Sequence, residues 1–271
     1  MKVALFIFSL VWGLSVSADT YAYDPEDMKR LKENGQCRDC DLRQSKMQAD
    51  LMPGADLSGS KLRDSILKHI NLQDALLVDV DLRRTDHEKS NLKNANLRGA
   101  TLRGSDLEKA DISGARFDEA DMRDADLENV IASATSFIEA DLRKANMKRG
   151  IFKDADFTNA VLTDSNFKRA ILTGAILRNA KMKNVRLSRA DLSGANLSGA
   201  NLRFAIFYRA NLKNANFSEA NMDGTVLWGP NISVANLSDV ENLKQSQLDN
   251  ACGNSKTQLP EDLSVRMCAT N

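Results

Sequence analysis

Four cysteines carry the most reactive side chains of this 271-residue chain: Cys37, Cys40, Cys252 and Cys268. The first two have the C-x-x-C spacing, which in a cytosolic protein is typical of a redox dithiol or of half a zinc site. In an oxidising compartment the same residues would instead form structural disulfides. Which chemistry applies depends on the compartment and on where the two pairs lie in the fold.

Groups suited to acid–base or metal chemistry are few. His87 falls at an inward position of the chain's repeat with no nucleophile or carboxylate definable beside it, so we expect a neutral core histidine with a local hydrogen bond. Six carboxylates recur at related positions: Asp86, Glu88, Asp106, Glu108, Asp126 and Glu128. They would suit Ca²⁺, but they lack the spacing of a calcium loop, and Lys89 and Lys109 follow them. We therefore predict no enzyme activity, no metal site and no cofactor.

These residues are set in a repeat of five. Steps of five residues lead from Leu42 to Leu237 through 40 centres without insertion or deletion, and 38 of them are Leu, Met, Phe or Ile. The exceptions are His87 and Ala132, and a small residue, usually Ala, precedes each centre by two. A large and a small inward residue in every five require a bend in every five. Four bends close a coil of twenty residues, which stacks on the next at a β-ladder spacing of ~4.8 Å.

The segment "ADLSGANLSGANL" at residues 190–202 shows the pattern clearly. It resembles the pentapeptide-repeat family, whose A(D/N)LXX units form a right-handed, four-sided parallel β-helix. The resemblance implies an all-β solenoid of about ten coils, some 48 Å long at ~4.8 Å a coil. We divide the chain into a signal peptide (1–18), an N-terminal cap with a short helix at 25 to about 33 (19–39), the solenoid (40–239) and a C-terminal cap or tail (240–271).

Within such a rod the two cysteine pairs lie at opposite ends, too far apart to share a zinc ion bound by Zn–S bonds of about 2.3 Å. We expect two local disulfides, Cys37–Cys40 and Cys252–Cys268. Exported family members with segments similar to "CRDCDL" and "TQLPEDL" support this pairing, although the connectivity stays open at this point.

The N-terminus predicts export. Lys2, an apolar run from Val3 to about Leu14, and small residues before Asp19 have the order of a secretory signal peptide. The apolar run is short for a membrane span, so an uncleaved anchor is the less favoured interpretation. We expect a periplasmic or extracellular protein with no transmembrane segment in the mature chain.

Two outward patterns are candidates for function. One is a row of arginines, one to a coil, from Arg43 to Arg143, which would suit phosphates unless the aspartates two residues earlier neutralise it. The other is an apolar cluster in two late coils: Phe204, Ile206, Tyr208, Val226 and Trp228. Exposed apolar clusters mark contact sites, so this cluster is the predicted interface for a protein partner or a homodimer, unless the C-terminal tail covers it.

The favoured function is therefore an exported, non-catalytic scaffold or protein-binding module. One alternative, implied by the family resemblance, is a mimic of duplex DNA that binds a type II topoisomerase such as gyrase. Such a mimic needs a strongly acidic surface, whereas Lys+Arg and Asp+Glu both number 37 here. The balance also gives no reason to expect a nucleic-acid partner. A surface that binds a cation or a phosphate ligand is the remaining alternative.

Overall fold

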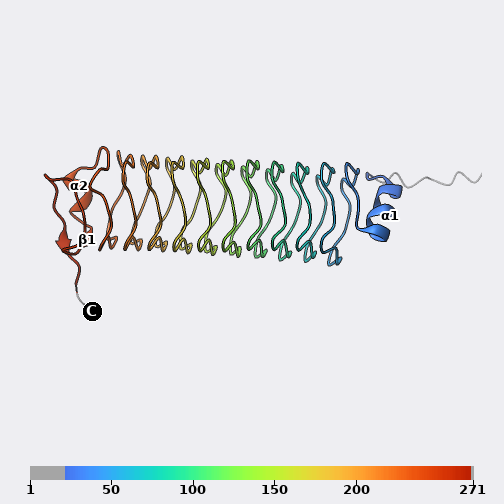
Figure 1. The fold of residues 1–271 in the computed structure, drawn as a ribbon, viewed down its shortest axis with the longest axis horizontal. Helices are drawn as coiled ribbons and strands as arrows, with labels where there is room; N and C mark the ends of the chain where they lie inside the picture. Colours follow the sequence, from blue (N-terminus) through green and yellow to red (C-terminus); the bar gives the residue numbers. More distant parts are fainter. Residues whose placement is uncertain (1–21, 270–271) are drawn as a thin grey trace, which may run out of the picture.

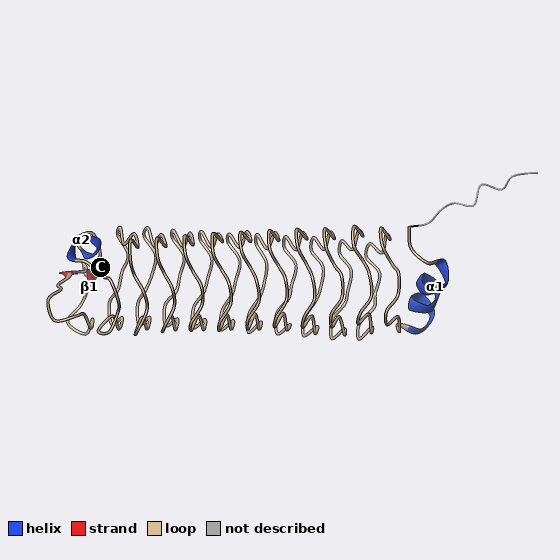
Figure 2. Ribbon diagram, turned by 90° about the horizontal axis from the view of Figure 1, so that it is seen from above, coloured by secondary structure: helices blue, strands red, loops and turns tan. Residues whose placement is uncertain are grey.

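The computed structural model describes residues 22–269, so the signal peptide assigned to residues 1–18 lies outside the described residues. The described chain is an elongated rod of stacked coils, with a helix at one end and an irregular tail at the other (Figure 1). The regular elements are α1 (Pro25–Asn34), α2 (Gln245–Leu248), β1 (Cys252–Gly253) and β2 (Arg266–Met267). A view turned by 90° shows the same stack between the two ends (Figure 2).

Parallel backbone pairing holds the stack together. From Gln36↔Asp56 to Asn221↔Glu241, each bridge joins one residue to the residue twenty positions later. Every bridge is a single residue long, because the chain bends again after each five-residue step. Twenty residues therefore make one coil with four faces. We number the faces by their first two centres: face 1 (Leu42, Leu62), face 2 (Met47, Leu67), face 3 (Met52, Leu72) and face 4 (Leu57, Leu77).

The bend comes from a left-handed residue at each corner. Two residues after nearly every centre φ is positive, as at Asn94 (55°), Asp164 (63°) and Gly199 (66°). Asn, Asp and Gly adopt this conformation at the lowest steric cost. A backbone hydrogen bond closes most corners, as from the Ala95 amide to the Leu92 carbonyl at 3.1 Å. Repetition of this corner is what turns a five-residue period into a four-sided coil.

The lumen is filled by the two inward residues of each step. Leu107 and Ala110 are fully buried, and so are nearly all their equivalents. On face 4 the rings of Phe117, Phe137 and Phe157 stack, with centroids 5.4 and 4.8 Å apart. The hydrophobic core is therefore one continuous column along the rod, and outward side chains are free for other roles.

Helix α1 lies against the first coil, at the position where the sequence predicts a helix. Asp24 caps it by accepting a hydrogen bond from the Glu26 amide, and Gly35 ends it at φ 65°. Leu31 is buried against the coil, and a carboxylate oxygen of Asp27 accepts the Asp41 amide at 2.8 Å. These contacts attach the helix to the open edge of the stack.

The C-terminal tail continues the ladder out of register. Asn231 pairs with Cys252 and Asn236 with Gln258, separations of 21 and 22 residues in place of 20. Strand β1 then pairs in parallel with β2. The side chain of Gln247 donates hydrogen bonds to the Met222 and Thr225 carbonyls, at 2.9 and 3.0 Å. The tail thus packs on the end of the last coil.

Candidate binding surface on face 2

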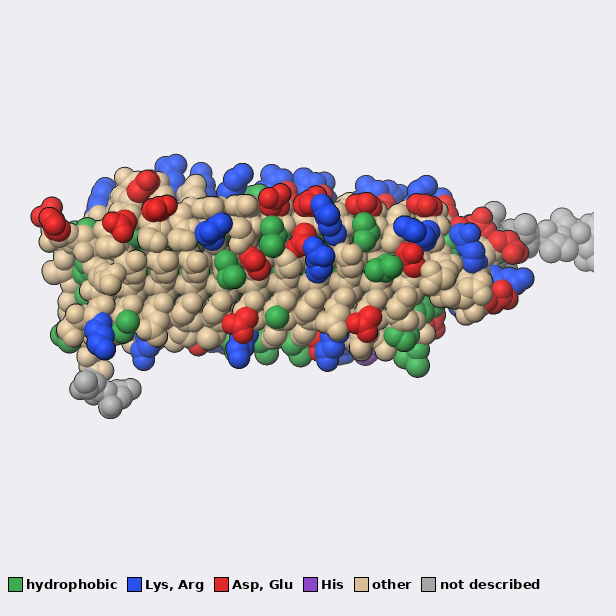
Figure 3. Space-filling model, in the orientation of Figure 1, with side chains coloured by type: hydrophobic (Ala, Val, Ile, Leu, Met, Phe, Trp, Pro, Cys, Tyr) green, Lys and Arg blue, Asp and Glu red, His purple; other side chains and the backbone are tan. Residues whose placement is uncertain are grey.

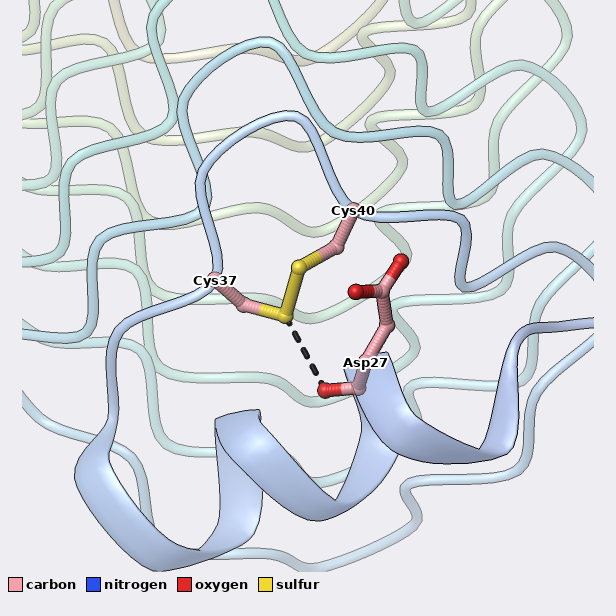
Figure 4. Close-up of side chains that lie close together, drawn as sticks. All are labelled: Asp27, Cys37 and Cys40. Carbon is pink, nitrogen blue, oxygen red and sulfur yellow. Dashed lines mark hydrogen bonds between the residues drawn. A yellow bond between two sulfur atoms is a disulfide. The ribbon is translucent and has the colours of Figure 1, made fainter.

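The cysteines form two disulfides, Cys37–Cys40 and Cys252–Cys268, and none is free. The first lies beside α1, where the Cys37 sulfur is 3.1 Å from the main-chain carbonyl oxygen of Asp27 (Figure 4). Asp27, Cys37 and Cys40 are the only potential metal-ligand group in residues 22–269. Because both sulfurs are bonded to each other, they offer no thiolate to a metal or a substrate. The cysteines are structural.

His87 is fully buried in the lumen on face 2. Neither ring nitrogen has a hydrogen-bond partner, so the expectation of a locally hydrogen-bonded histidine is wrong. Burial disfavours the imidazolium and lowers the pKa of His87 to about 4, against a small opposing effect of the Asp86 carboxylate. The inward neighbours along its column are Leu67 and Leu107. His87 is therefore a neutral core residue with no catalytic arrangement around it.

The arginine row on face 1 is neutralised. Arg43, Arg83 and Arg123 each form an ion pair of 2.6 Å with the aspartate two residues earlier. The hydrogen bond from Arg123 is the main reason why the pKa of Asp121 lies below its usual range. Figure 3 shows Lys and Arg side chains along one edge of the rod with acidic side chains beside them. This row has little charge left for a phosphate.

Face 2 carries the carboxylates that the sequence places together, here named the acidic segment: Asp86, Glu88, Asp106, Glu108, Asp126 and Glu128. Several are paired: Glu88 contacts Lys68 and Lys89 at 2.9 Å each, and these hydrogen bonds, that of Lys89 first, lower the pKa of Glu88 to about 2. Asp106 contacts no cation among the described residues. Desolvation and then the carboxylates around it raise the pKa of Asp106. The acidic segment therefore keeps uncompensated negative charge.

The next coils of face 2 carry the opposite charge. The basic segment comprises Lys148, Lys168, Arg169, Arg186 and Arg189. Of these, only Lys148 is near a carboxylate in the described chain, at 3.8 Å from Glu128. Lys148, Lys168, Arg186 and Arg189 line a shallow hollow of about 440 Å³ together with Tyr208.

Sequence reasoning missed this segment because the whole chain is balanced. A local count would have found it. Residues 101–140 contain 4 Lys+Arg against 10 Asp+Glu, a net charge of −6, while residues 141–220 contain 15 against 6, a net charge of +9.

The predicted apolar cluster, here the aromatic patch, lies on face 2 after the basic segment: Phe204, Ile206, Tyr208, Val226 and Trp228. Trp228, Phe204 and Val226 are 58%, 44% and 43% exposed, so the C-terminal tail does not cover them. Tyr208 meets Trp228 edge to face at 5.6 Å, and the guanidinium of Arg209 lies 5.2 Å from the Tyr208 ring centroid. Ile206 and Tyr208 are partly buried.

The backbone conformation of Phe204 is unusual for an aromatic residue. It sits at a corner with φ 59°, where most coils have Asn, Asp, Gly or a long charged residue. A bulky aromatic residue in the left-handed region costs about 1 kcal/mol or more. Its ring lies over Gly224 of the next coil, where an added Cβ would meet the ring at 2.5 Å. Local backbone preference gives no reason for phenylalanine here.

The family model for pentapeptide repeats matches eight copies, over residues 55–86, 75–114, 110–149, 151–189 and 190–229. The chain belongs to the pentapeptide-repeat family. Among solved structures, this pentapeptide-repeat protein is similar to HetL of the cyanobacterium Nostoc sp. strain PCC 7120, a protein involved in regulating heterocyst differentiation. The two share 28% identity over 78% of this chain and 97% of that one, with a TM-score of 0.64.

The fold is also that of QnrB1, a plasmid-mediated fluoroquinolone resistance protein, at 15% identity over 78% of this chain and 92% of that one, with a TM-score of 0.53. No curated protein matches the sequence. Among the helices formed by residues 22–269, none has the length and apolarity needed to cross a membrane.

Proposed function

We propose that this pentapeptide-repeat protein is exported to the periplasm or the cell exterior, where it acts as a rigid, non-catalytic protein-binding rod. The N-terminal sequence supports export, and two disulfides are typical of an oxidising compartment. In this proposal the rod is a right-handed solenoid of ten coils. Helix α1 and the tail act as caps that keep the open edges of the stack from pairing with other chains.

The observation that carries the binding role is the exposure of the aromatic patch. Five apolar side chains project from two adjacent coils, and Trp228 remains 58% exposed with the tail in place. Trp and Tyr are the commonest energetic anchors of protein interfaces. An apolar cluster on an otherwise polar rod is therefore best explained as a contact surface.

The alternatives have less support. A mimic of duplex DNA needs a strongly acidic surface, but residues 141–220 carry a net charge of +9. The carboxylates of the acidic segment do not form a group of three with ligand atoms close enough for one cation in the described chain. A phosphate ligand is favoured by the basic segment alone and leaves the aromatic patch unexplained.

Site-specific photocrosslinking tests this function. The full chain, including residues 1–18, is expressed with a photoreactive phenylalanine in place of Trp228. The control carries the same photoreactive residue in place of Leu76, which is 44% exposed on face 4. We expect a covalent protein adduct from position 228 and none from position 76. We also expect the purified protein to lack residues 1–18 and to contain no free thiol. No adduct at position 228, or equal adducts at both positions, would contradict the binding role, and retained residues 1–18 would contradict export.

A further inference from the structure

We propose that face 2 binds a second copy of this chain in antiparallel orientation, so that the acidic segment of each copy lies on the basic segment of the other. This inference rests on the proposed protein-binding function and names the partner. Its basis is the order of side chains along one face: carboxylates in the coils of His87, Leu107 and Leu127, cations in those of Met147, Phe167 and Leu187, and apolar groups after them.

A two-fold axis in the plane of the interface and perpendicular to the rod reverses the rod direction but preserves the strand direction. Each outward column of face 2 then meets the same column of the second copy. With the axis between the coils of Leu127 and Met147, the pairs of opposite charge that meet across the interface are Asp86 with Arg186, Glu108 with Lys168, and Glu128 with Lys148. Every pair occurs twice, as symmetry requires for an isologous contact. These three carboxylates also contact Lys68, Lys109 and Arg149 of their own chain, at 3.0, 2.7 and 2.6 Å.

The same register also brings residues of the aromatic patch into contact with the second copy. Ile206 meets Ile66 of the second copy, and Tyr208 meets Lys68, whose ammonium can lie over the phenol ring. Ile66 and Lys68 are both partly exposed. The apolar end of one copy therefore rests on the first coils of the other, beyond the acidic segment.

Other arrangements of the same two faces are worse. A parallel pair about an axis along the rod reverses the strand direction and would place Glu108 on Asp106 of the second copy. A shift of the antiparallel register by one coil would place a charged coil opposite its own copy, either that of Leu127 or that of Met147. Like charges in apposition cost several kcal/mol, so the face selects one register.

An extended anionic ligand explains less of the face. Such a chain, laid along the basic segment, would reach the acidic segment after about three coils, or ~15 Å at the ladder spacing. A second copy places opposite net charge on both segments at once, because its charges run in the opposite order; Asp106 and Asp126 then face Asn166 and Asn146.

The contact is expected to be weak. A face ~48 Å long and three strand residues, ~10 Å, wide covers about 480 Å² per copy. The total of about 1,000 Å² lies at the lower limit for a specific interface. Like charges also meet at two corners, Lys109 near Arg169 and Lys89 near Arg189 of the second copy, although Lys109 and Lys89 are paired with Glu108 and Glu88 of their own chain at 2.7 and 2.9 Å. The dimer should therefore be sensitive to salt and concentration.

Charge reversal in trans tests the proposal on the mature, disulfide-bonded protein. The base-reversed variant carries Lys168→Glu and Arg186→Glu, and the acid-reversed variant carries Asp86→Lys and Glu108→Lys. Each variant opposes like charges in its own dimer, but one copy of each restores every pair. The control, Lys153→Glu with Lys213→Glu, makes the same change in net charge as the base-reversed variant, but on face 3, where both lysines are exposed. Light scattering gives the molar mass, and Trp228 fluorescence reports burial of the patch.

We expect the unaltered protein and the control to dimerise at low salt. Each reversed variant should associate at least tenfold more weakly, and their equimolar mixture should recover the original affinity, which also shows that both variants fold. A monomeric unaltered protein, an unaffected reversed variant or a mixture that stays monomeric would overturn the proposal. If the protein is monomeric and position 228 still crosslinks to a different protein, only the second copy is refuted. If position 228 crosslinks to nothing, the binding function fails as well.

Discussion

Faces 1 and 2 carry similar numbers of charged side chains, but they arrange them differently. On face 1 a positive charge and its partner lie two residues apart in the same coil, as in Arg123 and Asp121 at 2.6 Å. On face 2 the carboxylates occupy one set of coils and most of the cations another. Local pairs cancel within one coil or between neighbouring coils, as Lys68 and Glu88 do at 2.9 Å, whereas charges several coils apart along a rigid rod cannot reach each other. The difference teaches that the distance between opposite charges, not their number, decides which face can attract a partner.

The lumen side and the solvent side of face 2 differ even more in their tolerance of a charged side chain, and a substitution at Leu107 tests this difference. Leu107→Asp adds a carboxylate to the lumen, where Leu107 is fully buried, one residue after the outward carboxylate of Asp106. An uncompensated buried charge should lower the free energy of unfolding by about 4 kcal/mol or more.

Denaturant unfolding measures this loss, and Leu107→Met, which nearly conserves volume, should cost less than about 1.5 kcal/mol. A melting temperature close to that of the unaltered protein for Leu107→Asp would show that the inward register is wrong.

The lumen of face 2, unlike that of face 1, contains a titratable group. Because the pKa of His87 is about 4 in the folded protein and about 6.5 in an unfolded chain, only the unfolded chain gains this proton between these values. Stability should therefore decrease as the pH falls from 6.5 to 4, by about 3 kcal/mol in total.

His87→Leu should remove this part of the pH dependence and raise stability at neutral pH by about 1–3 kcal/mol, since it removes two unsatisfied polar atoms. The exposed His69 provides the control: it lies at a corner with φ 57°, so the control substitution is His69→Asn, which tolerates this conformation and should leave stability at neutral pH nearly unchanged. Parallel pH profiles for the His87 variant and the unaltered protein would refute this role.

The dissociation constant of the dimer, measured for charge reversals on each face, compares the outer sides of faces 1 and 2 directly. Arg83→Glu with Arg123→Glu on face 1 should change the dissociation constant by about twofold at most, whereas Lys168→Glu with Arg186→Glu on face 2 should raise it at least tenfold, or about 1.4 kcal/mol. At about 1 M salt, where the Debye length is ~3 Å, the contrast should shrink. Equal effects of the two double substitutions would remove the distinction between the faces.

The smallest effect is expected from a single pair on face 1. Asp121→Asn removes the charge that holds Arg123, and both side chains are partly exposed. Exposed pairs of this kind contribute about 1 kcal/mol or less, so thermal unfolding should change little and self-association not at all. A loss above about 2 kcal/mol would mean that the arginine row is structural.

Much of the rod could be predicted from sequence because its rule is local. The inward positions, the helix near Pro25 and both cysteine pairs follow from short spacings and from the family resemblance. The aromatic patch was also located in advance, but its exposure depended on the path of the tail. The hydrogen bond expected for His87 was wrong: neither ring nitrogen has a partner, and the adjacent inward positions of its column are Leu67 and Leu107, which offer no side-chain donor or acceptor.

The sequence by itself determined the five-residue period, the division into inward and outward residues, and the separation of charge between residues 101–140 and 141–220. These properties depend on residues a few positions apart or on simple counts. Only the tertiary structure decided which charges pair across coils, as Lys68 does with Glu88 at 2.9 Å, and that the tail leaves Trp228 exposed. The physical reason is that each coil returns to its starting face after twenty residues, so contacts between coils depend on closure of the whole turn and on side-chain conformations that no local spacing encodes.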